Sequence, residues 1–132
     1  MNLLVVDDEP AVCTVLQLLL AREGHGVTVC HDGTVALDIL AHTTPDLALI
    51  DLNLPLVNGM SVIAAVRNIR PNVPIIIITG MLSTSSSDPR DHPEIGALAG
   101  AYCLAKPFKP RDLSCLVARV LSPDAGSVSQ SA

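Results

Sequence analysis

The feature that most constrains the fold is a regular alternation along the chain between short apolar runs and amphipathic segments. Five aliphatic runs predict strands, at residues 3–6, 27–30, 47–51, 74–79 and 101–105. Apolar residues at helical spacing predict helices at residues 10–22, 36–40, 62–69, 94–100 and 110–121. Strict alternation requires parallel strands, because each crossover is right-handed and buries its apolar side against the sheet. We therefore expect an α/β fold, a three-layer, doubly wound, five-stranded parallel sheet.

Prolines, glycines and an aspartate indicate where the predicted helices begin and end. Pro10 fits the first turn of a helix, and Gly24 with Gly26 is expected to end that helix near residue 22. Asp32-Gly33 is expected to form a turn before the second helix. The side chains of the first helix that we expect to face the sheet are Val12, Val15, Leu16, Leu19 and Leu20.

Length and composition indicate one domain with an aliphatic core. The 132 residues include Tyr102 and Phe108 as the only aromatic side chains, so Val, Leu, Ile and Ala must fill the core of a sheet buried on both faces. We assign the domain to residues 1–121 and expect residues 122–132 to be a disordered C-terminal tail or linker. The formal net charge is -5 and the sequence has no basic run, which argues against direct contact with nucleic acid.

The cysteines and the hydropathy pattern indicate the cellular compartment of the protein. The four cysteines Cys13, Cys30, Cys103 and Cys115 form no C-x-x-C pair and are expected to be buried thiols in a reducing compartment. We find no leader before the first strand and no apolar stretch of the roughly 20 residues that span a bilayer. The sequence therefore predicts a cytoplasmic protein without membrane contact.

Polar side chains follow four of the five predicted strands at the point where each strand ends. Asp7-Asp8 follow the first strand, Asp51 and Thr79 end the third and fourth, and Lys106 follows the fifth. In an open parallel sheet, ligands bind in the crevice at the carboxyl ends of the strands. We therefore expect these side chains to meet at one edge of the sheet.

The residue types at this edge predict phosphoryl chemistry with a metal ion. Three converging carboxylates repel one another unless a cation neutralises them, and Mg²⁺ suits oxygen ligands with room for water and a phosphoryl oxygen. Asp51 beside that ion is expected to be a nucleophile towards phosphorus. Lys106 would balance the added charge, and Thr79 would donate a hydrogen bond to a phosphoryl oxygen.

Each of these residues also has a purely structural explanation. Asp7 or Asp8 could cap the first helix, and Asp51 could open a turn. Thr79 could be an ordinary strand residue, and Lys106 a solvated surface lysine. The functional interpretation rests on their coincidence at four strand ends.

The same residues carry a resemblance that covers residues 3–121. The matching segments are Val5-Val6-Asp7-Asp8-Glu9-Pro10, Asp51-Leu52-Asn53-Leu54-Pro55 with Gly59-Met60, Thr79, and Lys106-Pro107-Phe108. With them the chain resembles the response-regulator receiver family of two-component phosphorelay systems, in particular single-domain receivers of the chemotaxis type.

The resemblance implies a flavodoxin-like strand order of 2-1-3-4-5 and a role for each site residue. It implies that Asp51 is the phosphoacceptor and that Thr79 and Lys106 recognise the phosphoryl group. Mg²⁺ would be held by Asp7, Asp8, Asp51 and the carbonyl oxygen of Asn53. The implied partners are a histidine kinase or histidine phosphotransfer protein, and a downstream protein that binds the fourth helix, fifth strand and fifth helix. Self-phosphotransfer and autodephosphorylation would be the only catalysis.

Several positions depart from the family pattern, and they concern signalling. Cys103 stands where an aromatic residue is common, three positions before the lysine, and Tyr102 precedes it. The identity of a switching residue therefore stays open between the two. Gly80 stands where Ala is usual, and the segment 83–93 is longer than the usual loop.

Two other functions compete with phosphorylation-controlled signalling. One is a receiver-like scaffold that binds partner proteins without being phosphorylated. The other is an aspartate-nucleophile phosphatase, suggested by Asp51-x-Asn53, although an amide cannot transfer the proton that this class requires. A flavin site is disfavoured because the loop after the first strand is acidic.

Overall fold

The computed structural model describes residues 1–52, 54, 59–79, 101–106 and 108–121. Several predictions fall outside these residues: the helix at 94–100, the loop at 83–93, the tail at 122–132, and the positions of Asn53, Gly80 and Pro107. They stay predictions.

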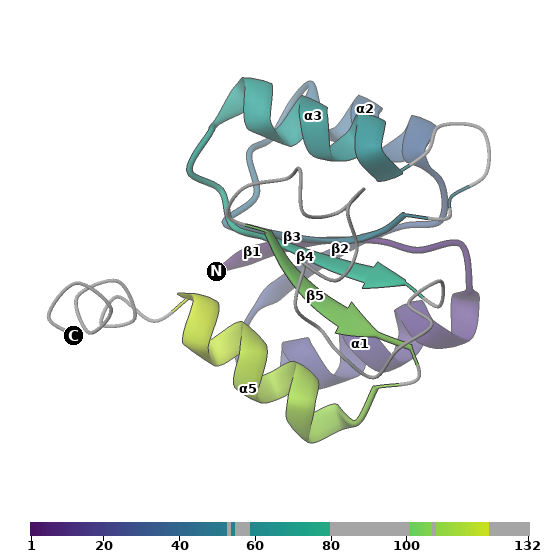
Figure 1. Cartoon of the computed structure of the whole chain (residues 1–132), viewed down its shortest axis with the longest axis vertical. Helices are drawn as coiled ribbons and strands as arrows, with labels where there is room; N and C mark the ends of the chain where they lie inside the picture. The colour runs from purple at the N-terminus through teal and green to yellow at the C-terminus, as the bar shows by residue number, and fades with distance from the viewer. Residues whose placement is uncertain (53, 55–58, 80–100, 107, 122–132) are drawn as a thin grey trace, which may run out of the picture.

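The fold is the predicted five-stranded parallel sheet, in the order β2-β1-β3-β4-β5. The strands are β1 (Asn2–Val6), β2 (Gly26–Cys30), β3 (Leu47–Asp51), β4 (Ile75–Thr79) and β5 (Ala101–Ala105). The described helices are α1 (Pro10–Arg22), α2 (Gly33–Leu40), α3 (Gly59–Ile69) and α5 (Pro110–Leu121). All strands run in the same direction, so their carboxyl ends lie at one edge (Figure 1).

Two helical layers cover the sheet, α1 with α5 on one face and α2 with α3 on the other (Figure 1). The isoleucines of β4 show how one strand contributes side chains to the core on both faces of the sheet. Ile75 and Ile77 pack in the cluster under α2 and α3, whereas Ile76 and Ile78 pack in the cluster under α1 and α5. Successive side chains of a strand point to opposite faces, so a continuous run of isoleucines is what a central strand needs.

The inward side of α1 differs from the prediction. Its buried residues are Cys13, Leu16 and Leu20, whereas Val15 is 43% exposed. Because this helix is apolar on nearly all sides, hydrophobicity alone could not separate neighbouring positions. Gly24 ends the helix with a φ of 91°, a conformation that glycine adopts without a steric penalty, but Gly26 begins β2 instead of ending the helix.

The expected turn at Asp32-Gly33 is instead the start of α2. Asp32 is the N-cap residue, and its Oδ1 accepts a hydrogen bond from the Val35 N–H at 2.9 Å. Gly33 is then the first helical residue and is buried. A capping aspartate and a turn aspartate use the same side-chain hydrogen bond, so the residue type alone does not distinguish them.

The prediction that all four cysteines are buried is wrong for one of them. Cys13, Cys30 and Cys103 are buried, but Cys115 on α5 is exposed, and all four are free thiols. Burial raises the pKa of Cys13 and of Cys30 to about 11, so both stay protonated at neutral pH. No helix within the described residues is both long and apolar enough to cross a membrane.

Candidate functional site

An acidic cluster lies at the carboxyl edge of the sheet. Asp7 directly follows β1, and Asp51 is the last residue of the neighbouring strand β3. Both are buried, whereas Asp8 and Glu9 are exposed. One carboxylate oxygen from each of these four residues lies within 4.8 Å of the other three.

Backbone contacts around the start of α1 fix the orientation of Asp7. Its N–H donates to the Cys30 carbonyl oxygen at 3.0 Å, and its Oδ1 accepts from the Glu9 N–H at 2.9 Å. The second contact partly bears out the structural explanation of Asp7, because Glu9 is the N-cap of α1 and has no side-chain cap of its own. It occupies only one carboxylate oxygen, so Oδ2 remains for the cluster.

Lys106 places its ammonium among three of these carboxylates. Lys106 Nζ lies 2.8 Å from Asp7 Oδ2, 2.8 Å from Glu9 Oε1 and 2.9 Å from Asp51 Oδ2. Burial alone would lower the pKa of Lys106, but the three carboxylates outweigh that effect and the net pKa is raised. The lysine is therefore a permanent positive charge beside Asp51, and the solvated-lysine explanation is wrong.

Among the buried side chains that the structure describes, Asp7 is the one with an oxygen that accepts no hydrogen bond. Burial raises its pKa above the ordinary value of 3.8, and the contacts with the Lys106 ammonium and the Glu9 N–H offset this only in part. Although Oδ2 is close to Lys106, this contact is an ion pair without hydrogen-bond direction, and the buried oxygen has no hydrogen bond within the described residues. A buried acceptor facing three other carboxylates fits a hard divalent cation such as Mg²⁺.

The structure thus brings together four of the predicted site residues, Asp7, Asp8, Asp51 and Lys106. Thr79 ends β4 and pairs with Ala105 of β5 in the sheet, at the same edge. Its side chain and all of Asn53 lie outside the described residues.

Sequence analysis missed one member of the cluster, Glu9. The available signal was a third acidic residue directly after Asp7-Asp8. A glutamate before a helix is ordinarily interpreted as favourable to the helix dipole, so its residue type gave no reason to place it in the site.

Comparison with known proteins identifies the family. The model of the response regulator receiver domain matches residues 3–118. The chain belongs to the response regulator receiver family. This confirms the resemblance and agrees with the strand order and the acidic pocket.

Curated relatives include longer proteins. The chain is 38% identical over 121 residues to the DNA-binding response regulator MtrA of Mycolicibacterium smegmatis, covering 90% of this chain and 48% of the relative. It is 35% identical over 114 residues to the response regulator MprA of Mycobacterium avium, covering 86% of this chain and 47% of the relative. The chain thus spans about half the length of these relatives.

Solved structures of receivers superpose on most of the chain. The chemotaxis protein CheY4 of Vibrio cholerae is 28% identical with a TM-score of 0.78, covering 91% of this chain and 98% of that one. The receiver domain of the sensor histidine kinase PA1611 of Pseudomonas aeruginosa is 29% identical with a TM-score of 0.75, covering 91% and 96%. The latter structure has a magnesium ion coordinated in the active site cleft.

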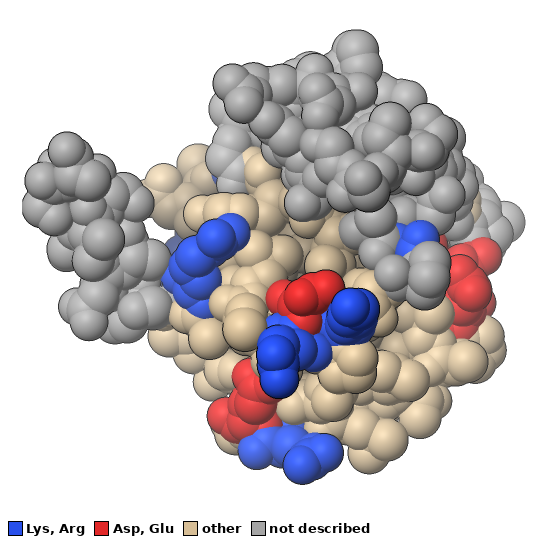
Figure 2. Space-filling model, turned by 60° about the horizontal axis from the view of Figure 1, so that its bottom comes forward, with Lys and Arg blue, Asp and Glu red and all other residues tan. Residues whose placement is uncertain are grey.

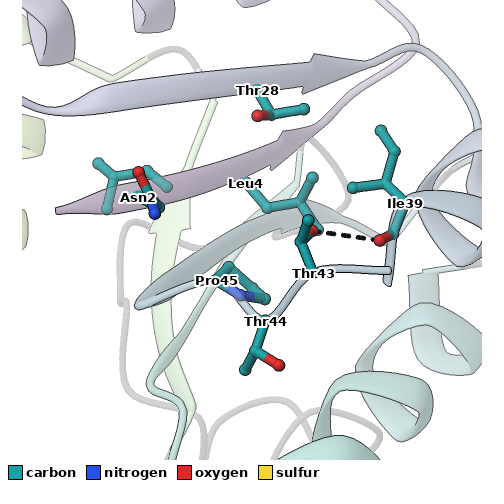
Figure 3. A pocket seen from close by; sticks show the side chains of 8 residues that line it. Asn2, Leu4, Thr28, Ile39, Thr43, Thr44 and Pro45 are labelled. Atoms are coloured by element: carbon teal, nitrogen blue, oxygen red, sulfur yellow. Dashed lines mark hydrogen bonds between the residues drawn. The ribbon is translucent and has the colours of Figure 1, made fainter. Parts of the chain in front are cut away.

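A pocket of about 250 Å³ lies at the opposite edge, near the amino end of β1 (Figure 3). It is lined by Asn2, Leu3, Leu4, Thr28, Ile39, Thr43, Thr44 and Pro45. Thr43 uses its hydroxyl within the protein, since Oγ1 donates to the Ile39 carbonyl oxygen at 3.1 Å. The lining has no ionisable side chain, so the pocket offers nothing for acid–base or metal chemistry.

The surface on the side of α1 and α5 has charged side chains of both signs. Figure 2 shows this face, where Lys and Arg side chains are interspersed with Asp and Glu side chains among uncharged residues. In this view the described residues form no continuous basic stripe.

Proposed function

We propose that this chain is a phosphorylatable receiver that accepts a phosphoryl group on Asp51 from a histidine kinase or histidine phosphotransfer protein, and that phosphorylation changes which partner it binds. The observation that carries the proposal is the placement of Asp51 Oδ2 2.9 Å from Lys106 Nζ, at the sheet edge where three other carboxylates gather. A carboxylate held beside a fixed cation is suited to transfer of an anionic group.

The proposed transfer forms one bond and breaks one. An oxygen of the Asp51 carboxylate attacks the phosphorus of a phosphohistidine, the P–N bond breaks, and its electron pair returns to the donor imidazole. Lys106 offsets the negative charge that arrives on Asp51, and Thr79 is proposed to donate a hydrogen bond to a phosphoryl oxygen. Mg²⁺, when bound, would supply charge neutralisation for the transferring group.

The residues proposed to hold Mg²⁺ are Asp7, Asp8, Asp51 and the carbonyl oxygen of Asn53. The buried Oδ2 of Asp7, which has an ion pair but no hydrogen bond within the described residues, and the spacing within the acidic cluster support this assignment. The magnesium ion in the Pseudomonas aeruginosa receiver supports it by analogy.

Mass spectrometry of the intact protein tests the proposal. The chain would be incubated with Mg²⁺ and acetyl phosphate, and separately with a phosphorylated histidine kinase. We expect an increment of one phosphoryl group with at least one donor, and no increment in Asp51→Asn or after chelation of the metal. An increment that survives in Asp51→Asn would show that the acceptor is another residue.

The labelling experiment and two further measurements separate the competing functions. A chain that stays unmodified with both donors would favour the non-phosphorylated scaffold. Continuous turnover of small phosphoesters would favour the aspartate-nucleophile phosphatase, which we do not expect because Asn53 carries no transferable proton. A coloured purified protein would favour the flavin site.

The extent and output of the receiver are further proposals. We assign the receiver unit to residues 1–121 and propose that 122–132 is a tail or linker. We propose the fourth helix, β5 and α5 as the output face, with Tyr102 or Cys103 as the switching residue. These two side chains differ in environment, since Tyr102 is exposed whereas Cys103 is buried in the core. A cytoplasmic location also stays a prediction.

A further inference from the structure

The three carboxylates around the Lys106 ammonium differ sharply in their exposure to solvent. The side chains of Asp7 and Asp51 are 0% and 3% exposed, and that of Lys106 itself is 13% exposed. Glu9 is 58% exposed, although its Oε1 is as close to the ammonium as either aspartate, at 2.8 Å. Only one of the three partners can therefore move into water without leaving a buried position.

The position of each residue in the fold reinforces this difference. Asp51 is the last residue of β3, and Asp7 is held by the backbone contacts that follow β1. Glu9 is the N-cap of α1, and its longer side chain reaches across to Lys106 from solvent. An exposed ion pair contributes little net free energy, because water competes for both charges. The Glu9–Lys106 contact is thus the exchangeable one.

A phosphoryl group on Asp51 would bring new anionic oxygens to an ammonium that already lies close to three carboxylates. A lysine has three N–H donors, and three carboxylate oxygens lie within 2.9 Å of Nζ. Two of these donors form hydrogen bonds, to Glu9 Oε1 and Asp51 Oδ2, so a phosphoryl oxygen would compete with these two contacts for the ammonium. Asp7 and Asp51 are buried at the ends of their strands and are also the proposed ligands of Mg²⁺, so neither can turn away from the site. Glu9 is 58% exposed and can be released to water.

We propose that Glu9 is a positioning residue that competes with the phosphoryl group for Lys106. In the unphosphorylated chain it holds the ammonium, and phosphorylation releases it. This inference rests on the proposed function, since it concerns the same acceptor. Glu9 thereby sets how readily Asp51 becomes and stays phosphorylated.

Two variants separate the contact of Glu9 from its charge. Glu9→Gln removes the charge, whereas Glu9→Asp keeps the charge but shortens the side chain by one methylene, so that it no longer reaches Lys106. Glu23→Gln is the matched control, because Glu23 is an exposed glutamate at the other end of α1. The affinity of each protein for Mg²⁺ alone would first be measured by calorimetry, so that later steps use saturating metal.

The probe of the phosphoryl site is beryllofluoride, followed by fluorine NMR at saturating Mg²⁺. We expect Glu9→Gln and Glu9→Asp both to bind beryllofluoride more tightly than the unsubstituted chain, by about two- to fivefold, which is the range for an exposed ion pair. Labelling by acetyl phosphate should accelerate by a similar factor. Glu23→Gln should match the unsubstituted chain in both measurements.

The possible outcomes are distinguishable. Unchanged beryllofluoride affinity in both Glu9 variants would overturn the inference. A gain in Glu9→Gln alone, with Glu9→Asp unchanged, would also overturn it, because charge and not contact would then be responsible. If the unsubstituted chain neither binds beryllofluoride nor accepts a phosphoryl group, the proposed function fails first.

Discussion

At the scale of single residues, Lys106 is the side chain that allows two carboxylates to be buried at the sheet edge. Asp7 and Asp51 each lie within 2.9 Å of its ammonium. Burial of a charge is costly unless an opposite charge is fixed beside it. The aliphatic core around the site has no group that could offset these two negative charges, so the Lys106 ammonium offsets them.

Replacement of this lysine should therefore destabilise the fold when no metal is present. We expect Lys106→Met to lower the free energy of unfolding by about 3–5 kcal/mol in the presence of a chelator, because removing one partner leaves uncompensated buried charge. Urea denaturation measures this difference. Lys109→Met is the matched control, since Lys109 is exposed, and should change little. Equal stability of the two variants would show that Lys106 does not support the buried carboxylates.

At the scale of elements, the start of α3 is packed directly against the end of the strand that carries Asp51. A methyl group added at Gly59 would lie 2.7 Å from the Leu52 Cα and would meet the Asp51 carbonyl oxygen as well. The Gly59 N–H also donates to the Leu52 carbonyl oxygen at 3.2 Å. The close packing of α3 against the end of β3 therefore requires a residue without a side chain at position 59.

Gly59→Ala should disturb both stability and phosphorylation. We expect a loss of about 1–3 kcal/mol in the free energy of unfolding, typical of overpacking against backbone that cannot yield. Labelling of Asp51 by acetyl phosphate should slow in the fraction that remains folded, because the backbone of the acceptor must shift. Gly24→Ala tests the specificity of the effect, since Gly24 has open space around it and only its positive φ is strained. It should lose stability without slowing the labelling.

The elements themselves could largely be predicted, because the alternation of apolar runs and helical spacing directly reflects burial. The isoleucines of β4 are the clearest example. Prediction was less accurate where several interpretations shared one residue type. Val15 lies on an apolar helix whose inward side is decided by packing with the sheet, and Asp32 can serve a turn or a helix start with the same hydrogen bond.

The candidate site could be predicted in outline, because strand ends of a parallel sheet converge on one edge whatever their distance in sequence. That rule alone predicts that Asp7, Asp51 and Lys106 lie together. It could not include Glu9, whose membership depends on the reach of an exposed side chain across space.

At the scale of the whole molecule, the sheet separates two unlike edges. The carboxyl edge has a surplus of negative charge, with four carboxylates near one ammonium. The opposite edge has an uncharged pocket bordered by threonines and aliphatic residues (Figure 3). Repulsion within the carboxyl edge opposes folding of the whole domain, because the cluster assembles only when β1 and β3 pair in the sheet.

Mg²⁺ should therefore stabilise the entire fold and not the site alone. A ligand that binds the folded state raises the free energy of unfolding by about 2.7 kcal/mol at a concentration one hundred times its dissociation constant. We expect thermal unfolding to move to higher temperature as Mg²⁺ is added and to return when the metal is chelated. Asp8→Asn should weaken this response, because Asp8 is exposed and contributes its carboxylate to the cluster, whereas Glu23→Gln should retain it. Identical responses of the two variants would mean that the cation binds elsewhere, since both lose one negative charge and only one of them loses a member of the cluster.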